Sequence, residues 1–423
     1  MTSNFYPPPP VNLRRLLWFA SDKDWAIEAR LLRWLTFLWI FVGLAILFSA
    51  SYPVADVETG DGLFYFKRQI GAIAIALIGF NLIVYSPLRY ILGIADWFVI
   101  LLLGVIISTL LPGLGTTVNG ATRWLAIGSF LVQPSELIKP FLVLQSARIF
   151  GQWERLKWST RLIWIGIFAL TLAAILLQPN LSTAALCGMM IWLIALAAGL
   201  PWLYLGGAAG SGLILAVISV SIKEYQRRRL MSFLNPWSDP AGDGYQLIQS
   251  LLAIGSGGFW GTGYGMSQQK LDYLPIQYTD FIFAVFAEEF GLVGSLLLLL
   301  LLGAYATVGL RVAIRAKNQV HQLVAIGVVV LLVGQSLLNV GVVTGTLPTT
   351  GLPFPLLSYG GNSVISSLLA AGILIRVARE SSEAEVRSLD KQRSQRSRPK
   401  AVKPSPEAPP HFAPPPLRPI PLQ

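Results

Sequence analysis

The chain has 423 residues, of which 54% are hydrophobic and only 13% are charged. Because soluble domains carry about 25% charged residues, this composition excludes an ordinary soluble protein and predicts an all-α polytopic membrane protein. The formal net charge of +11 is not gathered into a basic patch with interleaved aromatic residues, so we expect contact with anionic membrane lipid and no nucleic-acid partner.

The first 30 residues are polar, contain four consecutive prolines at 7–10, and predict a flexible N-terminal arm. The arm lacks the pattern of a cleaved secretory signal, so we interpret the first apolar segment as an uncleaved anchor. The single cysteine, Cys187, excludes a disulfide framework within the chain. His321 and His411 have no metal-ligand partner at useful spacing, so no protein metal site is predicted.

The chain is long enough for about ten membrane spans, and about ten apolar segments follow the arm. The predicted spans cover residues 31–50, 69–85, 94–111, 134–150, 162–177, 182–199, 204–221, 281–308, 323–343 and 356–375. The fourth is the weakest, because it contains Glu136, Lys139 and Gln145. We expect one membrane domain over 31–380, with a large extracytoplasmic loop, 222–280, between the seventh and eighth helices.

Ten spans place both termini on one side of the membrane, and the Lys and Arg counts indicate which side. If the N-terminus is cytoplasmic, the cytoplasmic connections hold most basic residues, and the exception, the arginines at 227–229, lies in the one long outside loop. Long loops count little in the positive-inside rule, so we predict that both termini are cytoplasmic. The basic and then Pro-rich segment 381–423 predicts a disordered cytoplasmic tail, either without a specific task or with a polyproline-type docking role.

Three loops that fall on the outer face in this topology hold the unusual residues of the chain, at 113–133, 223–279 and 344–355. Their convergence predicts one candidate site at that face. Within the second loop, 245–254 has the apolar spacing of a short interfacial helix. The glycine-rich run GSGGFWGTGYG at 255–265 is not a nucleotide-binding P-loop, and it is either an irregular loop packed on the bundle or a ligand-contacting loop.

Three acids stand in the segment 273–291, which reads YLPIQYTDFIFAVFAEEFG. An ionised carboxylate inside a bilayer span costs about 2.5–3.5 kcal/mol on insertion scales, so Glu288 and Glu289 need partners or a function. Asp280 precedes the apolar run, where a helix dipole favours a carboxylate and where a partly desolvated acid is also suited to general-base chemistry. Glu288 falls on a face similar to that of Asp280, and Glu289 points roughly opposite.

Basic and aromatic side chains elsewhere have two interpretations each. Trp124, beside Arg123, is either a membrane-interface anchor or a platform for a sugar. Glu136 and Lys139 lie one helical turn apart, so they either neutralise each other or direct Lys139 towards a phosphate. The arginines at 227–229 are suited to hold a diphosphate or to contact lipid headgroups.

Taken together, five blocks of sequence carry a resemblance. They are NGATRWLAIGSFLVQPSELIKP, QPNLSTA, SFLNPWSDPAGDGYQLIQSLLAIGSGGFWGTGYG, KLDYLPIQYTDFIFAVFAEEFG and TLPTTGLPFPLLSYGGNS. In this order they resemble the SEDS family of shape, elongation, division and sporulation proteins, over about 33–379. The short run GYGMSQQKLDYLP is more similar to the division-type members than to the elongation-type members, which usually have a longer insert there.

The resemblance implies an inverting peptidoglycan glycosyltransferase that polymerises lipid II on the outer face of the bacterial inner membrane. It also implies a class B penicillin-binding protein and other cell-division proteins as partners. Asp280 matches the proposed catalytic Asp of the family's TDF motif, and Trp124 matches the Trp of its RW motif. The residues expected to contact the substrate are Trp124, Arg123, Lys139, Glu136, Arg227, Arg228, Arg229, Tyr278 and Glu288.

Charge on the departing diphosphate would be stabilised by the arginines at 227–229, by Lys139, or by a bound divalent cation such as Mg²⁺ or Mn²⁺. Three positions depart from the family pattern: Asn180 replaces an acid, Tyr278 replaces a His and Thr350 replaces a Lys. The missing lysine favours Arg123 and the 227–229 cluster as phosphate ligands. Rival interpretations are a lipid II flippase, an elongation-type polymerase and a non-catalytic scaffold.

Overall fold

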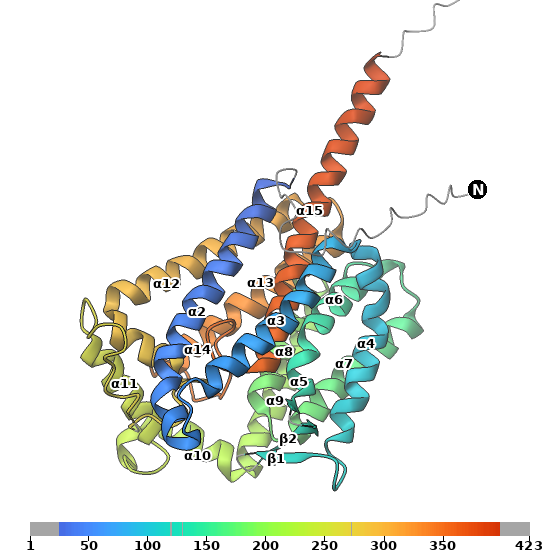
Figure 1. Ribbon diagram of the computed structural model, residues 1–423. Coiled ribbons are helices and arrows are strands. Elements are labelled where there is room, and N and C mark those ends of the chain that lie inside the picture. Colours follow the sequence, from blue (N-terminus) through green and yellow to red (C-terminus); the bar gives the residue numbers. More distant parts are fainter. Residues whose placement is uncertain (1–24, 119–120, 129, 272, 398–423) are drawn as a thin grey trace, which may run out of the picture. The chain divides into compact units, whose positions relative to one another are not determined.

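The computed structural model describes residues 25–118, 121–128, 130–271 and 273–397. The chain divides into two units, Met1–Ser382 and Glu383–Gln423, and the first is a bundle of helices (Figure 1). Its main helices are α2 (Ile27–Thr59), α3 (Phe64–Tyr85), α4 (Leu88–Ser108), α5 (Pro134–Leu137), α6 (Lys139–Phe150), α7 (Trp158–Leu177), α8 (Leu181–Ala197), α9 (Trp202–Ile222), α12 (Ile282–Arg315), α13 (Gln319–Val329), α14 (Gln335–Val343) and α15 (Gly361–Ser397).

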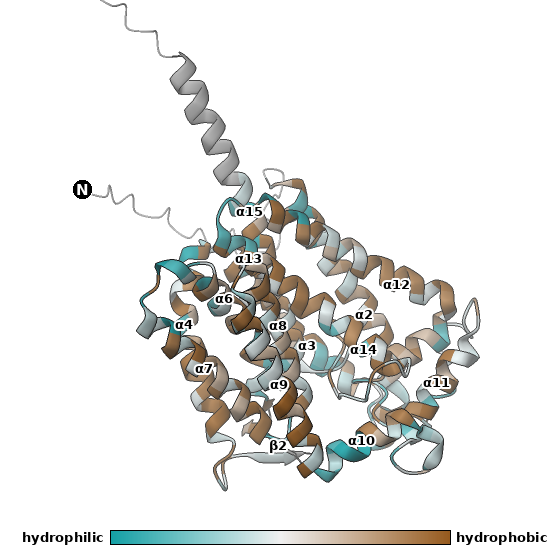
Figure 2. Cartoon of the chain, turned by 180° about the vertical axis from the view of Figure 1, so that it is seen from behind, coloured by the Kyte–Doolittle hydropathy of each residue, from teal (hydrophilic) through white to brown (hydrophobic). Residues whose placement is uncertain are grey.

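Eight helices of the described residues are long and apolar enough to cross a membrane, and apolar residues dominate the middle of the bundle (Figure 2). These helices coincide with eight of the ten predicted spans, so the chain is a multi-pass membrane protein. The other two predicted spans are the pair α5–α6, with its buried charges, and α8, which has only 17 residues. A total of ten crossings stays a prediction.

The last predicted span begins too early. We expected it at 356, whereas α15 begins at Gly361. The preceding residues read LPFPLLSYG, and Leu356 at the predicted start has φ 60°, which lies outside the right-handed helical region. At its other end α15 continues to Ser397, inside the segment that composition predicts to be disordered. Glu, Ala, Arg, Leu and Gln in that stretch are good helix formers.

α12 is two helices joined at a break. Gly291 has φ 63° and ψ −161°, a conformation open to glycine and strained for other residues. The glycine-rich run 255–265 packs against this break and completes its hydrogen bonds. The amides of Thr262 and Gly263 donate to the last carbonyls before it (2.9 and 3.1 Å), and the first amides after it donate to carbonyls of the run (3.0 and 3.2 Å). This part of the run is therefore an irregular loop packed on the bundle.

One end of the bundle carries a small sheet, which we call the sheet end. Three antiparallel strands lie in the order β1 (Thr116–Val118), β2 (Ala121–Ile127) and β3 (Phe130–Val132). The short helices α10 (Glu224–Leu234) and α11 (Tyr245–Gly257) lie at the same end (Figure 1). α11 confirms the helix predicted at 245–254. The sheet and α10 were not predicted, but the chain is mostly helical, and the predicted class of a helical polytopic membrane protein is confirmed.

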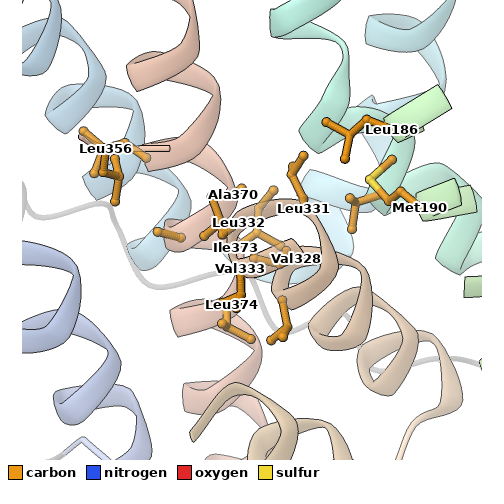
Figure 3. Packing of buried hydrophobic residues seen from close by; sticks show 14 of the residues in the cluster. Leu186, Met190, Val328, Leu331, Leu332, Val333, Leu356, Ala370, Ile373 and Leu374 are labelled. Atoms are coloured by element: carbon orange, nitrogen blue, oxygen red, sulfur yellow. The ribbon is translucent and has the colours of Figure 1, made fainter. Parts of the chain in front are cut away.

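Buried apolar side chains of α8, α13, η3 and α15 pack together in the core (Figure 3). Val328 and Leu332 lie against Ala370 and Leu374 there, all fully buried. Between α13 and α14 the chain makes a π-helical turn, η3 (Val330–Gly334), and two 3₁₀ turns, η1 (Trp153–Arg155) and η2 (Pro236–Ser238), complete the elements. The rigid core holds α14 and the segment that follows it, which form one wall of the site below.

Candidate functional site

A cavity of about 290 Å³ opens at the sheet end. Residues from all three predicted outer loops line it: Arg123 from β2, Tyr225 and Arg229 from α10, and 347–350 from the segment after α14. Asn180, at the start of α8, completes the wall. The predicted convergence of these loops is therefore observed, and two of the positions that depart from the family pattern, Asn180 and Thr350, face the same space.

Arg123 is fixed in the cavity wall by the end of α7. Its Nε donates to the carbonyl of Gln178 at 3.0 Å, and its Nη2 donates to the carbonyl of Pro179 at 2.5 Å. A cation is favourable beside the exposed carbonyls at a helix C-terminus. Burial lowers the pKa of Arg123 and nearby Arg229 lowers it further, opposed by Tyr225, but a guanidinium keeps its charge at neutral pH.

Arg229 is the second cation of the cavity. Its guanidinium lies over the ring of Tyr225, 4.6 Å from the centroid, and its Nη1 donates to the Thr349 carbonyl at 3.4 Å. α10 places Arg229 there because Tyr225 and Arg229 are four residues apart on one helical face. With Arg123 it gives the cavity two guanidinium groups, which suit an anion with several oxygens.

Asp280 lies beside Gly351, which follows the lining residue Thr350; neither Asp280 nor Gly351 is itself among the residues that line the cavity. A Cβ built on Gly351 would lie 3.8 Å from Asp280 Oδ2 and 3.7 Å from Arg229 Nη1, so the acid and the cation both lie close to this glycine. Gly351 has φ 70°, and a side chain there would occupy the gap between the two groups. No ion pair joins Asp280 to Arg229 across the part of the chain that the structure describes.

The Asp280 carboxyl group is partly accessible and largely surrounded by protein. Its Oδ1 accepts a hydrogen bond from the Thr279 hydroxyl at 2.8 Å. Burial raises the pKa of Asp280 above its ordinary value, and Thr279, its own backbone and then Arg229 oppose that rise. A carboxylate with a raised pKa beside a cavity is a stronger base than a free aspartate, which is the property that general-base catalysis uses.

Tyr278 belongs to a cluster of three tyrosines next to Asp280. Its ring stacks on Tyr65 with centroids 4.6 Å apart, and Tyr359 meets both rings edge-on at 5.1 and 5.7 Å. The Tyr65 hydroxyl donates to Glu58. Burial raises the pKa of Tyr278, so its hydroxyl stays protonated at neutral pH. None of the three rings is among the residues that line the cavity.

Three other predicted site residues lie outside the cavity wall. Trp124 follows Arg123 in β2, so the alternation of a strand turns it to the opposite face, where it pairs with Thr116. Arg227 and Arg228 are exposed, and Arg228 pairs with Glu224 at 2.6 Å. Of the three consecutive arginines, only Arg229 reaches the cavity.

The predicted charges inside the bundle have protein partners. Lys139 Nζ lies 2.6 Å from Glu136 Oε1, and both side chains are almost fully buried. Lys139 also donates to Gln335 Oε1 at 3.2 Å. Glu288 accepts hydrogen bonds from the Ser267 hydroxyl at 2.5 Å and from two amides of the loop before α12. The interpretation that Glu136 and Lys139 neutralise each other is thus confirmed, and Glu288 holds a loop rather than lining the cavity.

Glu289 is the centre of a buried ion pair that sequence reasoning missed. Its Oε1 accepts from Lys270 Nζ at 2.8 Å and from the Ser49 hydroxyl at 2.5 Å, and Lys270 also donates to Ser49 at 2.8 Å. Lys270 is 19 residues before Glu289 and Ser49 is 240 residues before it, so no local spacing reveals the contact. The only signal in the sequence is an isolated lysine in the loop.

A search of the described residues finds no group of three or more His, Cys, Asp and Glu side chains that could hold a metal ion. The positive charge at the site comes from Arg123 and Arg229. The fold and the site together define a polytopic helical membrane protein with a cationic cavity beside a partly desolvated carboxyl group at one end of its bundle.

The chain belongs to the FtsW/RodA/SpoVE family of cell cycle proteins, whose sequence model matches residues 29–383. It is 58% identical over 379 residues to the probable peptidoglycan glycosyltransferase FtsW of Synechocystis sp., a match that covers 89% of this chain and 96% of that one. Among solved structures it resembles a chain of a peptidoglycan synthase complex that coordinates polymerisation and crosslinking, with 28% identity, a TM-score of 0.68, and 85% and 99% coverage. It also resembles the rod shape determining protein RodA of Thermus thermophilus, with 26% identity, a TM-score of 0.62, and 85% and 98% coverage.

Proposed function

We propose that this protein is an inverting peptidoglycan glycosyltransferase that polymerises lipid II into glycan strands for septal wall synthesis. The observation that carries the proposal is the position of Asp280: its carboxyl group and the cavity-lining Arg229 both lie close to Gly351, the residue after Thr350 of the cavity wall. Membership of the family and the names of its relatives support this reaction class.

In the proposed reaction Asp280 acts as the general base. Its carboxylate accepts the proton of the 4-hydroxyl of GlcNAc in the incoming lipid II. The hydroxyl oxygen attacks C1 of MurNAc at the end of the growing chain, the C1–oxygen bond to the diphosphate breaks, and undecaprenyl diphosphate leaves with inversion at C1. Each addition therefore forms one glycosidic bond and releases one lipid diphosphate.

The two guanidinium groups are suited to the leaving group. A diphosphate gains negative charge as its bond to C1 breaks, and fixed cations stabilise that charge when they are already in position. Arg123 is held by two carbonyls, and Arg229 by a carbonyl and a ring, so neither needs to reorganise. A divalent cation would add to this charge, with the diphosphate oxygens as its main ligands.

The same proposal includes location and partners. The sheet end faces outwards from the bacterial inner membrane, both termini are cytoplasmic, and residues 31–380 form the membrane domain with 222–280 as its large outer loop. Lipid II is the substrate, and a class B penicillin-binding protein and other division proteins are the partners. We assign contacts with the sugars or the lipid headgroups to Trp124, Tyr278 and the exposed arginines at 227 and 228.

The main rival is a lipid II flippase, which needs a polar path through the bundle. The buried charges that suggested such a path are each matched by protein groups: Lys139 by Glu136, Lys270 by Glu289, and Glu288 by loop amides. This pairing favours the transferase. An elongation-type polymerase has the same chemistry and differs in its partner.

The test compares D280N with D243N in the full-length protein, reconstituted with a class B penicillin-binding protein and lipid II. Asp243 is an exposed acid of the same loop and is a matched control. We expect glycan polymer from the wild type and from D243N, and a loss of at least about a hundredfold in D280N, the lower end of the usual range for general-base catalysis. Polymer at the wild-type rate from D280N would refute the mechanism, and headgroup translocation in liposomes without polymer would favour the flippase.

A further inference from the structure

Three consecutive carbonyl groups just before α12 are each held by a donor from the segment 339–359. The Tyr278 carbonyl accepts from the Tyr359 amide at 2.9 Å. The Thr279 carbonyl accepts from the Ser358 hydroxyl at 2.5 Å, and the Asp280 carbonyl accepts from Asn339 Nδ2 at 2.6 Å. Two of these three donors are side chains, so the contact depends on residue identity.

Asn339 bridges two segments of the site. Its Nδ2 donates to the carbonyl of Asp280 and also to the carbonyl of Leu352 at 2.9 Å. The side chain is 1% exposed and belongs to the buried face of α14. Both contacts are donations to carbonyl oxygens, which an amide can make and an ionised carboxylate of the same shape cannot.

Ser358, in the loop between α14 and α15, makes a similar bridge. Its hydroxyl donates to the Thr279 carbonyl and accepts from the Phe354 amide at 2.8 Å. The side chain is 2% exposed. Ser358 therefore ties the backbone before Asp280 to the turn that follows the cavity wall.

The Asp280 carboxyl group is held more weakly than its backbone. Among the described residues its side-chain partner is the Thr279 hydroxyl, which moves with the same peptide. The direction of the carboxyl group is consequently set by the backbone at 278–280, and that backbone is set by Asn339 and Ser358. We call Asn339 and Ser358, with their hydrogen bonds to the carbonyls of Asp280 and Thr279, the clamp. Thr349 and Thr350, which lie between these two residues in the sequence, line the cavity.

We propose that Asn339 and Ser358 are positioning residues that fix the Asp280 backbone so that its carboxyl group stays beside Gly351, next to the cavity wall. They act through main-chain carbonyls and do not contact the substrate. This inference rests on the proposed function, because it assumes that Asp280 is the base. It adds a physical link between the wall of the cavity and the group that carries out the chemistry.

The test measures kcat and KM for lipid II in N339A, N339D, S358A and S358T, with the penicillin-binding partner present. The control is S336A, because Ser336 is also buried on α14 and its hydroxyl donates to the Leu332 carbonyl, away from Asp280. We expect kcat to fall about tenfold to a hundredfold in N339A and S358A, with KM within about threefold of the wild type, since misplacement of about 1 Å can cost a hundredfold in rate. S358T, which keeps the hydroxyl, should recover most of the rate.

N339D adds a second measurement that a merely structural role would not change. A new carboxylate near Asp280 disfavours its ionised form, so the acid limb of the kcat profile should move to higher pH in N339D and stay in place in S336A. Values of kcat within twofold of the wild type in both N339A and S358A would overturn the proposal. The proposal would also be overturned if kcat fell in proportion to the loss of melting temperature in all three variants N339A, S358A and S336A. Full activity of D280N would instead refute the proposed function, whereas an inactive D280N with active clamp variants would refute the clamp alone.

Discussion

Replacing Lys270 with Met should destabilise the protein by about 3–5 kcal/mol, the usual loss when one partner of a buried ion pair is removed. The Lys270 and Glu289 side chains are 5% and 0% exposed, so water cannot screen the charge that remains. In K270M, Glu289 would keep only the Ser49 hydroxyl on Oε1. Its Oε2 already lacks a hydrogen-bond partner among the described residues. The expected loss therefore lies towards the upper end of the range.

A double substitution separates the pair from its surroundings. K270M/E289L removes both charges and fills the space with apolar side chains, so we expect it to lie within about 2 kcal/mol of the wild type, the remainder being the lost acceptor of Ser49. The free energy of unfolding would be measured for both single variants and the double variant by denaturation in mixed micelles. A coupling energy below about 0.5 kcal/mol between the two positions would refute this account, because the substitutions would then be independent.

Two further predictions follow the same logic at other positions. R229Q should move the acid limb of the pH–kcat profile to higher pH, because Arg229 lowers the pKa of Asp280 and the base must be ionised to act. R228Q is the control, because Arg228 is exposed and paired with Glu224, and it should leave the acid limb unchanged. Equal pH profiles for the two variants would contradict the assignment of Asp280 as the base. G291A should cost more than about 3 kcal/mol in unfolding free energy, because its Cβ would lie 2.7 Å from the Phe259 carbonyl oxygen at a positive φ. Its control is G303A on the same helix, where nothing lies within 4 Å; similar stabilities of the two variants would argue against a required break.

The sequence is sufficient for the spans because lipid permits few alternatives. A run of apolar residues long enough to cross a bilayer must satisfy its own backbone as a helix, so composition determines structure there. The same reasoning fails at the sheet end. α10 reads EYQRRRLMSFL, whose charges resemble a solvated loop, and β2 is a short strand within a loop whose ends the spans already fix.

Some residues of the site could likewise be predicted from the sequence, and others could not. Asp280 and Arg123 could be proposed in advance because of the family resemblance: Asp280 matches the Asp of the TDF motif, and the missing lysine at 350 favoured Arg123. Asn339 and Ser358 could not, since each acts on the carbonyl of a residue at least 59 positions away, and an isolated polar residue in an apolar helix has many structural uses. The break at Gly291 was also missed, because nothing in a single sequence distinguishes this glycine from Gly303 in the same helix.

The order of the charged partners along the chain has a consequence for synthesis. Glu288 and Glu289 would each be costly in lipid as unmatched carboxylates. Among the described residues, the hydrogen-bond partners of their side chains all precede them: Ser49 in α2, and Ser267, Lys270 and the loop amides shortly before α12. The ribosome therefore delivers the partners first, and α12 can enter the bilayer when the groups that neutralise its acids are already present. A chain with the reverse order would have to insert two free carboxylates and wait for their partners.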